Sequence, residues 1–294
     1  MNAIAVAAPA GSRQLHKFGG SSLADVKCYL RVAGIMAEYA KPGDMMVVSA
    51  AGSTTNQLIS WLKLSQTDRI SAHQVQQTLR RYQSDLITGL LPPEMAEPLI
   101  ASFIHDLERL AVLLDGKITD AIYAEVVGHG EVWSARLMSA VLCKQELPAA
   151  WLDAREFLRA ERAAQPQVDE GRSYPLLQQL LAQHPQQYLV VTGFIARSEA
   201  GETVLLGRNG SDYSATQIGA LANASRVTIW SDVAGVYSAD PRKVKDACLL
   251  PLLRLDEASE LARLAAPVLH TRTLQPVSGS DIDLQLRCSY QPEQ

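Results

Sequence analysis

A lysine followed by two glycines and two serines is the first group in the sequence with an evident capacity for chemistry. Lys17 precedes Phe18, Gly19 and Gly20, and the serines follow directly. Paired glycines let backbone N–H groups approach phosphate oxygens, and the helix predicted to follow adds the positive end of its dipole. Lys17 supplies a mobile positive charge. A plain turn between strand and helix would explain the glycines alone, but the lysine and hydroxyls favour a phosphate-binding loop.

A second group of small and hydroxyl-bearing residues occupies positions 49–56, with the sequence SAAGSTTN. These residues could simply cap a helix. The hydroxyls, including those of Ser49 and Thr55, could equally bind a polar substrate together with backbone amides. The residues alone leave both interpretations open.

A third polar segment, LGRNGSDYSA at positions 206–215, lies between a predicted strand and a predicted helix. Arg208 is suited to bidentate capture of a carboxylate or phosphate. Asp212 falls in the first turn of the helix, where a carboxylate is stable. Capping by Ser211 and a dipole contact from Asp212 would be a purely structural explanation, but the arginine and its flanking glycines favour a binding role.

A fourth polar segment, WSDVAGVYSADPRK at positions 230–243, also follows a predicted strand. It offers polar groups at Ser231 and Asp232, an aromatic ring at Tyr237 and cations at Arg242 and Lys243. These groups suit the binding of a nucleotide. The alternative is an ordinary surface loop closed by the Asp-Pro turn.

The elements that must position these segments alternate as in an α/β fold. The apolar runs predict strands at 14–18, 45–49, 150–152, 188–192, 203–206 and 227–230, and a half-exposed or edge strand at 282–286. Helical spacing predicts helices at 23–39, 129–145, 211–221 and 256–264, and a mostly helical stretch from about 65 to 127, broken at Pro92 and Pro93. Each polar segment therefore follows a strand, which is where ligands bind in open α/β sheets.

Length and composition fit one large α/β domain. The chain has 294 residues, of which 47% are hydrophobic. Its net charge of -4 gives no electrostatic reason to expect nucleic acid or an anionic membrane as a partner. No apolar run approaches the roughly 20 residues of a membrane span. Four widely spaced cysteines fit a reduced, cytoplasmic protein, and we interpret residues 1–14 as a loose leader rather than a signal peptide.

The common phosphoryl-transfer signatures are missing from the sequence. It contains no GxxxxGK[ST], no HRD or DFG, and no GxGxxG opening a dinucleotide-binding unit. A protein of this sequence that handles ATP must use another framework.

In combination and in this order, the segments KFGGSS, VVSAAGSTTN, VGHGE, LLGRNGSDYSA and SDVAGVYSADPR resemble the aspartokinases of the amino-acid kinase superfamily. The resemblance runs from about residue 15 to 288. It implies a three-layer αβα sandwich around a largely parallel open sheet. One catalytic domain would span 1–294, with a helical insertion at about 65–127 and a nucleotide-binding lobe at about 190–290.

The resemblance implies an enzyme that transfers the γ-phosphoryl group of ATP to the side-chain carboxylate of L-aspartate. The product would be 4-phospho-L-aspartate, in the first step of the pathway to lysine, threonine and methionine. Mg²⁺ would be held mainly through the nucleotide phosphates, with no metal site made by the protein alone. L-aspartate and ATP would be the small-molecule partners, and the full-length protein would be a homo-oligomer, most simply a dimer.

The resemblance also implies residue roles. Lys17 and Asp212 would be catalytic, with Asp212 organising Lys17 and the phosphoryl site. Glu131 would pair with the α-ammonium group of aspartate and Arg208 with its α-carboxylate. The remaining substrate contacts would come from Ser49 and Thr55, and the ATP contacts from Lys17, Phe18, Gly19, Gly20, Ser231, Asp232, Tyr237 and Arg242.

The sequence departs from the family pattern at Pro267, where aspartokinases often carry a nucleotide-contacting lysine. Lys243 or Lys245 could supply the missing charge. Pro267 is the main support for a different interpretation, a nucleotide-binding regulatory module with little catalysis. A related kinase acting on glutamate, acetylglutamate or UMP is another alternative. The chain ends near the point where the regulatory ACT domains of the family begin, so we expect a piece of a longer bifunctional chain.

Overall fold

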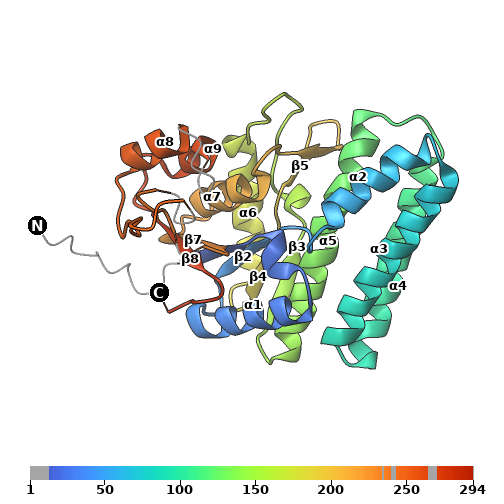
Figure 1. The fold of residues 1–294 in the computed structure, drawn as a ribbon, viewed down its shortest axis with the longest axis horizontal. Coiled ribbons are helices and arrows are strands. Elements are labelled where there is room, and N and C mark those ends of the chain that lie inside the picture. Colours follow the sequence, from blue (N-terminus) through green and yellow to red (C-terminus); the bar gives the residue numbers. More distant parts are fainter. Residues whose placement is uncertain (1–12, 234, 240–242, 264–269, 294) are drawn as a thin grey trace, which may run out of the picture.

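A six-stranded sheet runs through the centre of the protein (Figure 1). The computed structural model describes residues 13–233, 235–239, 243–263 and 270–293. In the order β3-β4-β2-β1-β7-β8, every neighbouring pair of strands is parallel, which confirms the predicted largely parallel sheet. The strands are β1 (Gln14–Phe18), β2 (Met45–Val48), β3 (Ala149–Leu152), β4 (Tyr188–Thr192), β7 (Arg226–Ser231) and β8 (Asp283–Cys288).

Both faces of the sheet are buried, as a parallel sheet requires. In β2, Met46 and Val48 point into one apolar cluster, while Met45 and Val47 point into another on the opposite face. The short continuous apolar runs that predicted these strands are therefore a consequence of burial on two sides.

Helices cover the two faces in the predicted three-layer arrangement (Figure 1). The first face carries α1 (Val26–Tyr39) and α5 (Asp120–Lys144). The opposite face carries α6 (Glu170–Gln183) and α7 (Gly210–Leu221). The helices α8 (Leu255–Arg263) and α9 (Thr271–Leu274) lie next to the edge strand β8. Their apolar side chains form a third, small apolar cluster with those of β8.

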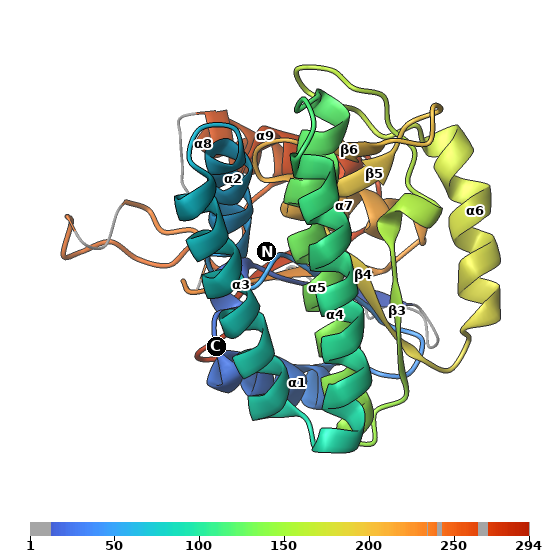
Figure 2. The same ribbon diagram turned by 90° about the vertical axis from the view of Figure 1, so that its right-hand side faces the viewer.

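The predicted helical stretch from about 65 to 127 contains α3 (Arg69–Leu90), α4 (Pro93–Leu114) and the start of α5, and α2 (Thr54–Ser65) precedes it. Figure 2 shows α3 and α4 as a long antiparallel pair outside the first face. The break at the two prolines is confirmed, because Pro92 caps α4 and Pro93 is its first residue. The next helix differs from the prediction: α5 begins at Asp120, with Thr119 as its cap, nine positions before His129.

One predicted strand does not belong to the main sheet. β6 (Thr203–Leu205) pairs antiparallel with β5 (Ile195–Arg197), a strand that the sequence did not predict, in a separate hairpin. The segment around Arg208 therefore follows this hairpin and not a strand of the parallel sheet. The predicted edge strand near residue 282 is confirmed, because β8 lies at one end of the sheet order. Within the described ranges, no helix has the length and apolar character needed to cross a membrane.

Gly219 sets how closely α7 approaches β7, and this contact yields a testable prediction. A Cβ at Gly219 would overlap Cγ2 of Val227 on β7. We expect Gly219→Ala to lower the free energy of unfolding by about 1–3 kcal/mol, because the helix must move off the sheet. Urea unfolding measures this change.

A matched control is Gly34→Ala in α1, where a Cβ would meet nothing within 4 Å. This substitution should instead stabilise the protein by about 0.5–1 kcal/mol, because alanine is the better helix former. Equal effects of the two substitutions would contradict the packing argument.

Candidate active site

The centre of the site is an ion pair between Lys17 and Asp212. Lys17 lies near the end of β1 on the face that α7 covers, and only 8% of its surface is exposed. Its Nζ atom is 2.5 Å from Oδ1 of Asp212, in the first turn of α7. The structure therefore joins two predicted catalytic residues that are almost 200 positions apart in the sequence.

The glycine loop after β1 lies directly against the loop after β2. A Cβ at Gly20 would be 2.7 Å from the carbonyl oxygen of Ala50, so only glycine fits there. The N–H group of Gly52 donates to the carbonyl oxygen of Gly20 at 2.9 Å. Gly52 itself has a φ of +51°, in the left-handed region that favours glycine. These contacts bring the first two predicted segments together.

The helix expected directly after the glycines begins later than predicted. A short 3-10 helix, Gly20–Leu23, follows the glycine pair, and α1 begins at Val26. The side chain of Asp25 caps α1 by accepting the N–H group of Cys28 at 2.8 Å. The N-terminus of α1 is thus closed by its own cap, which leaves Lys17 and the loop amides as the groups for an anion.

The second segment is tied to the third, and α3 supports it from outside. Ser49 donates from Oγ to Oγ of Ser211 at 2.9 Å, across the gap between β2 and α7. Thr55 is partly buried in the first turn of α2. Its neighbour Thr54 is fully buried and accepts a hydrogen bond of 2.9 Å from Gln83 of α3.

The support from α3 was missed in the sequence. Tyr82 of α3 donates to the carbonyl oxygen of Ala24 at 2.8 Å, beside the first loop. Gln83 is only 2% exposed and shares a helix face with buried Leu79 and Leu86. A polar residue at an apolar position of a helix was the available signal.

The segment VGHGE is helical, and its two glycines allow close contacts on two sides of α5. A Cβ at Gly128 would be 2.6 Å from a side-chain carbon of Ile195 in the β5–β6 hairpin. A Cβ at Gly130 would be 2.6 Å from Cβ of Ala50 in the second loop. These approaches explain why a helix contains two glycines, which disfavour helix formation.

Glu131 lies beneath the second loop with an incompletely satisfied carboxyl group. It is 3% exposed, and its Oε2 atom has no hydrogen-bond partner among the described residues. Burial raises the pKa of Glu131 to about 8, although the N–H group of Ala50 opposes the shift. The carboxyl group is therefore mostly neutral at pH 7, and an incoming cation would favour its ionised form.

Arg208 has the opposite environment. It is exposed in the turn between β6 and α7, and its guanidinium makes no ion pair within the described ranges. Its neighbours Gly207 and Asn209 have φ angles of +80° and +54°, which turn the chain sharply before the helix. The side chain is thus available to an anionic group.

The predicted nucleotide residues follow β7, the neighbour of β1 in the sheet. Ser231 ends β7 and donates from Oγ to Oδ1 of Asp232 at 3.1 Å. Tyr237 forms an isolated bridge with Leu249 and is partly buried. Arg242 and Pro267 lie outside the described residues. The first and fourth segments therefore leave adjacent parallel strands at the same edge.

The fold and the sequence place the chain in a known class: it belongs to the amino acid kinase family, whose model matches residues 12–288. It is 85% identical to the bifunctional aspartokinase/homoserine dehydrogenase 2 of Escherichia coli (strain K12), over all 294 residues of this chain and 36% of that protein. It is 33% identical to the lysine-sensitive aspartokinase 3 of the same organism, over 94% of this chain and 61% of that protein.

Solved structures agree with the family assignment. A crystal structure of E. coli aspartokinase III in complex with aspartate and ADP superposes with a TM-score of 0.87 at 30% identity. The match covers 95% of this chain and 62% of that one. The chain thus spans about a third of the bifunctional relative and less than two thirds of the single-function ones.

The buried carboxyl group of Glu131 predicts a pH-dependent stability. The folded protein holds this proton up to about pH 8, whereas an unfolded chain releases it near 4.5. The folded state binds more protons between these values, so the free energy of unfolding should fall as pH rises, by about 1.4 kcal/mol per pH unit from this group. Glu131→Gln should remove that contribution.

Urea unfolding at pH 6, 7 and 8, without added amino acid, measures the slope. Glu108→Gln on the exposed face of α4 is the control and should keep the wild-type slope. Parallel pH profiles for the wild type and Glu131→Gln would show that the carboxyl group is already ionised.

Proposed function

We propose that this chain is an aspartate kinase domain that transfers the γ-phosphoryl group of ATP to the side-chain carboxylate of L-aspartate. The product would be 4-phospho-L-aspartate. The observation that supports this most is the ion pair of Lys17 with Asp212, formed at the edge of the sheet where the glycine loop, the loop over Glu131 and the start of α7 meet. The crystal structure of aspartokinase III with aspartate and ADP supports the same pair of ligands.

The protein offers a partner of opposite charge to each of the two charged groups on the α-carbon of the substrate. An α-ammonium group would pair with Glu131, whose buried Oε2 atom has no hydrogen-bond partner in the part of the chain that the structure describes. The α-carboxylate would pair with the exposed guanidinium of Arg208. Ser49 and Thr55 would contribute hydroxyl groups to the rest of the substrate. The ammonium group would also lower the pKa of Glu131, so binding at neutral pH would release a proton.

The reacting end needs no general base, because a carboxylate with an ordinary pKa near 3.9 is already ionised at neutral pH. The difficulty is the repulsion between two anions, the attacking carboxylate and the γ-phosphoryl group. Lys17 would reduce it by placing an ammonium charge beside the transferring group, while Asp212 holds that charge in place. Catalysis would therefore consist of positioning and charge neutralisation.

The nucleotide would lie over the first and fourth segments. Phe18, Gly19 and Gly20 would contact the phosphates, and the close fit of Gly20 against Ala50 leaves that part of the backbone without side chains. Ser231, Asp232, Tyr237 and Arg242 would hold the rest of the nucleotide. Bound Mg²⁺ would neutralise phosphate charge. Among the residues that the structure describes, no group of three or more His, Cys, Asp or Glu side chains is arranged to hold a metal ion.

The remaining expectations concern the whole protein. The relatives' names support a role in amino-acid biosynthesis and a longer chain that includes a dehydrogenase. The cytoplasmic location and the homo-oligomer stay predictions from the sequence.

A hydroxamate assay with Mg-ATP tests the proposed function, because hydroxylamine traps acyl phosphates. We expect product with L-aspartate, and none with L-glutamate or without an amino acid. Glu131→Ala should raise the KM for aspartate at least about tenfold, since it removes a buried charged partner, and leave the KM for ATP within about twofold. Product with glutamate alone, or equal shifts in both KM values, would contradict the proposal.

A further inference from the structure

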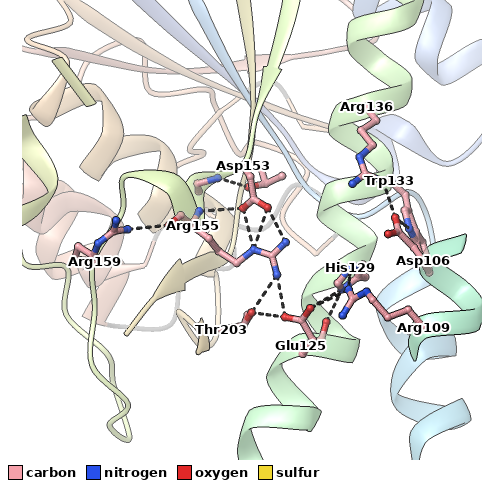
Figure 3. A network of polar contacts seen from close by, with 12 residues as sticks. Asp106, Arg109, Glu125, His129, Trp133, Arg136, Asp153, Arg155, Arg159 and Thr203 are labelled. Atoms are coloured by element: carbon pink, nitrogen blue, oxygen red, sulfur yellow. Dashed lines mark hydrogen bonds and ion pairs between the residues drawn. The ribbon is translucent and has the colours of Figure 1, made fainter. Parts of the chain in front are cut away.

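A cluster of charged and polar side chains from α5, α4, β6 and the segment after β3 surrounds the part of α5 that precedes Glu131, and the proposed function gives it no role (Figure 3). Glu125 is at its centre. We propose that Glu125 is a positioning residue that holds Glu131 and Arg208 at a fixed separation and so sets the affinity for the amino-acid substrate. This inference rests on the proposed function, and it assigns a residue of α5 that would not itself touch the substrate.

Glu125 connects three parts of the structure through its carboxylate. Its Oε2 atom accepts hydrogen bonds from Arg155 at 2.9 Å and from Thr203 of β6 at 2.5 Å. Its Oε1 atom accepts from Arg109 of α4 at 3.0 Å. Burial would raise the pKa of Glu125, but the hydrogen bond from Thr203 and the positive charges of Arg155 and Arg109 lower it to about 2. The carboxylate is therefore ionised at any physiological pH.

Arg155 is itself firmly anchored. Its guanidinium contacts both carboxylate oxygens of Asp153, with Nη2 2.6 Å from Oδ2 and Nε 3.0 Å from each oxygen. Asp153 directly follows β3, so this pair is attached to the edge of the main sheet. Charge-assisted, bidentate pairs of this kind are both strong and directional. Glu125 is thus pulled toward a cation that has little freedom to move.

His129 adds a second tie between α5 and α4. Its Nε2 atom is 2.7 Å from Nη2 of Arg109, and its Nδ1 atom is 2.7 Å from the carbonyl oxygen of Glu125. A guanidinium can only donate, so Nε2 accepts and Nδ1 carries the proton. Burial lowers the pKa of His129, which agrees with a neutral ring. Arg109 is therefore shared between His129 and Glu125.

The cluster ties together the two elements that lead to the proposed aspartate-binding residues. Glu131 follows Glu125 by six positions in the same helix, and Arg208 follows Thr203 by five positions, in the turn after β6. The close approach of Ile195 to Gly128 puts the hairpin in direct contact with α5 between these points. A hairpin released from Glu125 would shift Arg208 relative to Glu131, and the two halves of the clamp would no longer match one amino acid.

The environment of Glu125 makes the idea testable without loss of the fold. Its side chain is 22% exposed, in the wall of a groove of about 480 Å³ that Arg109, Arg155 and Thr203 also line. Water can therefore fill the space left by truncation. Arg155 would keep its partner Asp153, so no buried charge would be left alone.

Hydrogen–deuterium exchange and steady-state kinetics test the inference on three single variants and on the double variant of Glu125→Ala with Thr203→Val. Glu125→Ala and Thr203→Val both remove the tie to β6, while Glu125→Gln keeps an oxygen acceptor for Thr203. The matched control is Glu202→Gln, which breaks the ion pair between Glu202, next to Thr203 on the same hairpin, and Arg162, which lies outside α5. Thermal unfolding checks that each variant is folded at the assay temperature.

We expect faster exchange at the amides of residues 203–210 in Glu125→Ala and Thr203→Val, with β1 unchanged. The KM for aspartate should rise about tenfold in both, with kcat and the KM for ATP within about threefold, because misplacing a substrate-binding group weakens binding of the substrate. The double variant should be no worse than Glu125→Ala, since both changes break one contact. Glu125→Gln should be closer to the wild type.

Unchanged exchange in Glu125→Ala, or an equal rise in the aspartate KM in Glu202→Gln, would overturn the inference. A loss of stability with an unchanged aspartate KM would also overturn it, since that is the result of a merely structural role. A wild-type protein that forms no aspartyl hydroxamate would instead refute the proposed function. The exchange measurement would then still decide whether Glu125 holds the hairpin.

Discussion

The ion pair between Lys17 and Asp212 is the interaction on which the rest of the site depends. A lysine that is 8% exposed needs a partner, because an unpaired buried charge is very costly. The partner comes from α7, whose first turn must therefore reach the end of β1. Gly193 permits this approach, since a Cβ there would be 3.0 Å from Cβ of Ser211 and 3.1 Å from the carbonyl oxygen of Val48.

The same requirement for close approach recurs around the pair. Gly20 lies against Ala50, Gly130 against the same residue from α5, and Gly128 against the β5–β6 hairpin. Because glycine has no side chain, two loops, one helix and one hairpin can approach one another closely at these three positions. Glu131, whose buried carboxyl group would ionise beside an incoming ammonium group, and the exposed guanidinium of Arg208 then offer groups of opposite charge to the two ends of an amino acid.

The sequence predicted the features whose causes are local. Short apolar runs identified the central strands β2 and β4, because strands buried on both faces contain few polar residues, and alternation of apolar and polar residues identified the edge strand β8. Glycines identified the loops that follow β1 and β2. The hairpin of β5 and β6 and the support from Tyr82 and Gln83 were missed, because each depends on contacts between distant segments. The start of α5 has a local cause, since the Thr119 hydroxyl accepts the N–H group of Ile122, and this capping signal was overlooked. Pairing of Lys17 with Asp212 came from the family resemblance, since no local pattern connects residues so far apart.

A double-mutant cycle on the central ion pair tests the account most directly. Rates of aspartyl hydroxamate formation would be measured for the wild type, Lys17→Met, Asp212→Asn and the double variant, all confirmed as folded. The account predicts that Lys17→Met costs about a thousandfold or more in rate, that Asp212→Asn costs less, and that the double variant is about as slow as Lys17→Met alone, because Asp212 acts through Lys17. Near-normal turnover of Lys17→Met, or losses that multiply in the double variant, would contradict it.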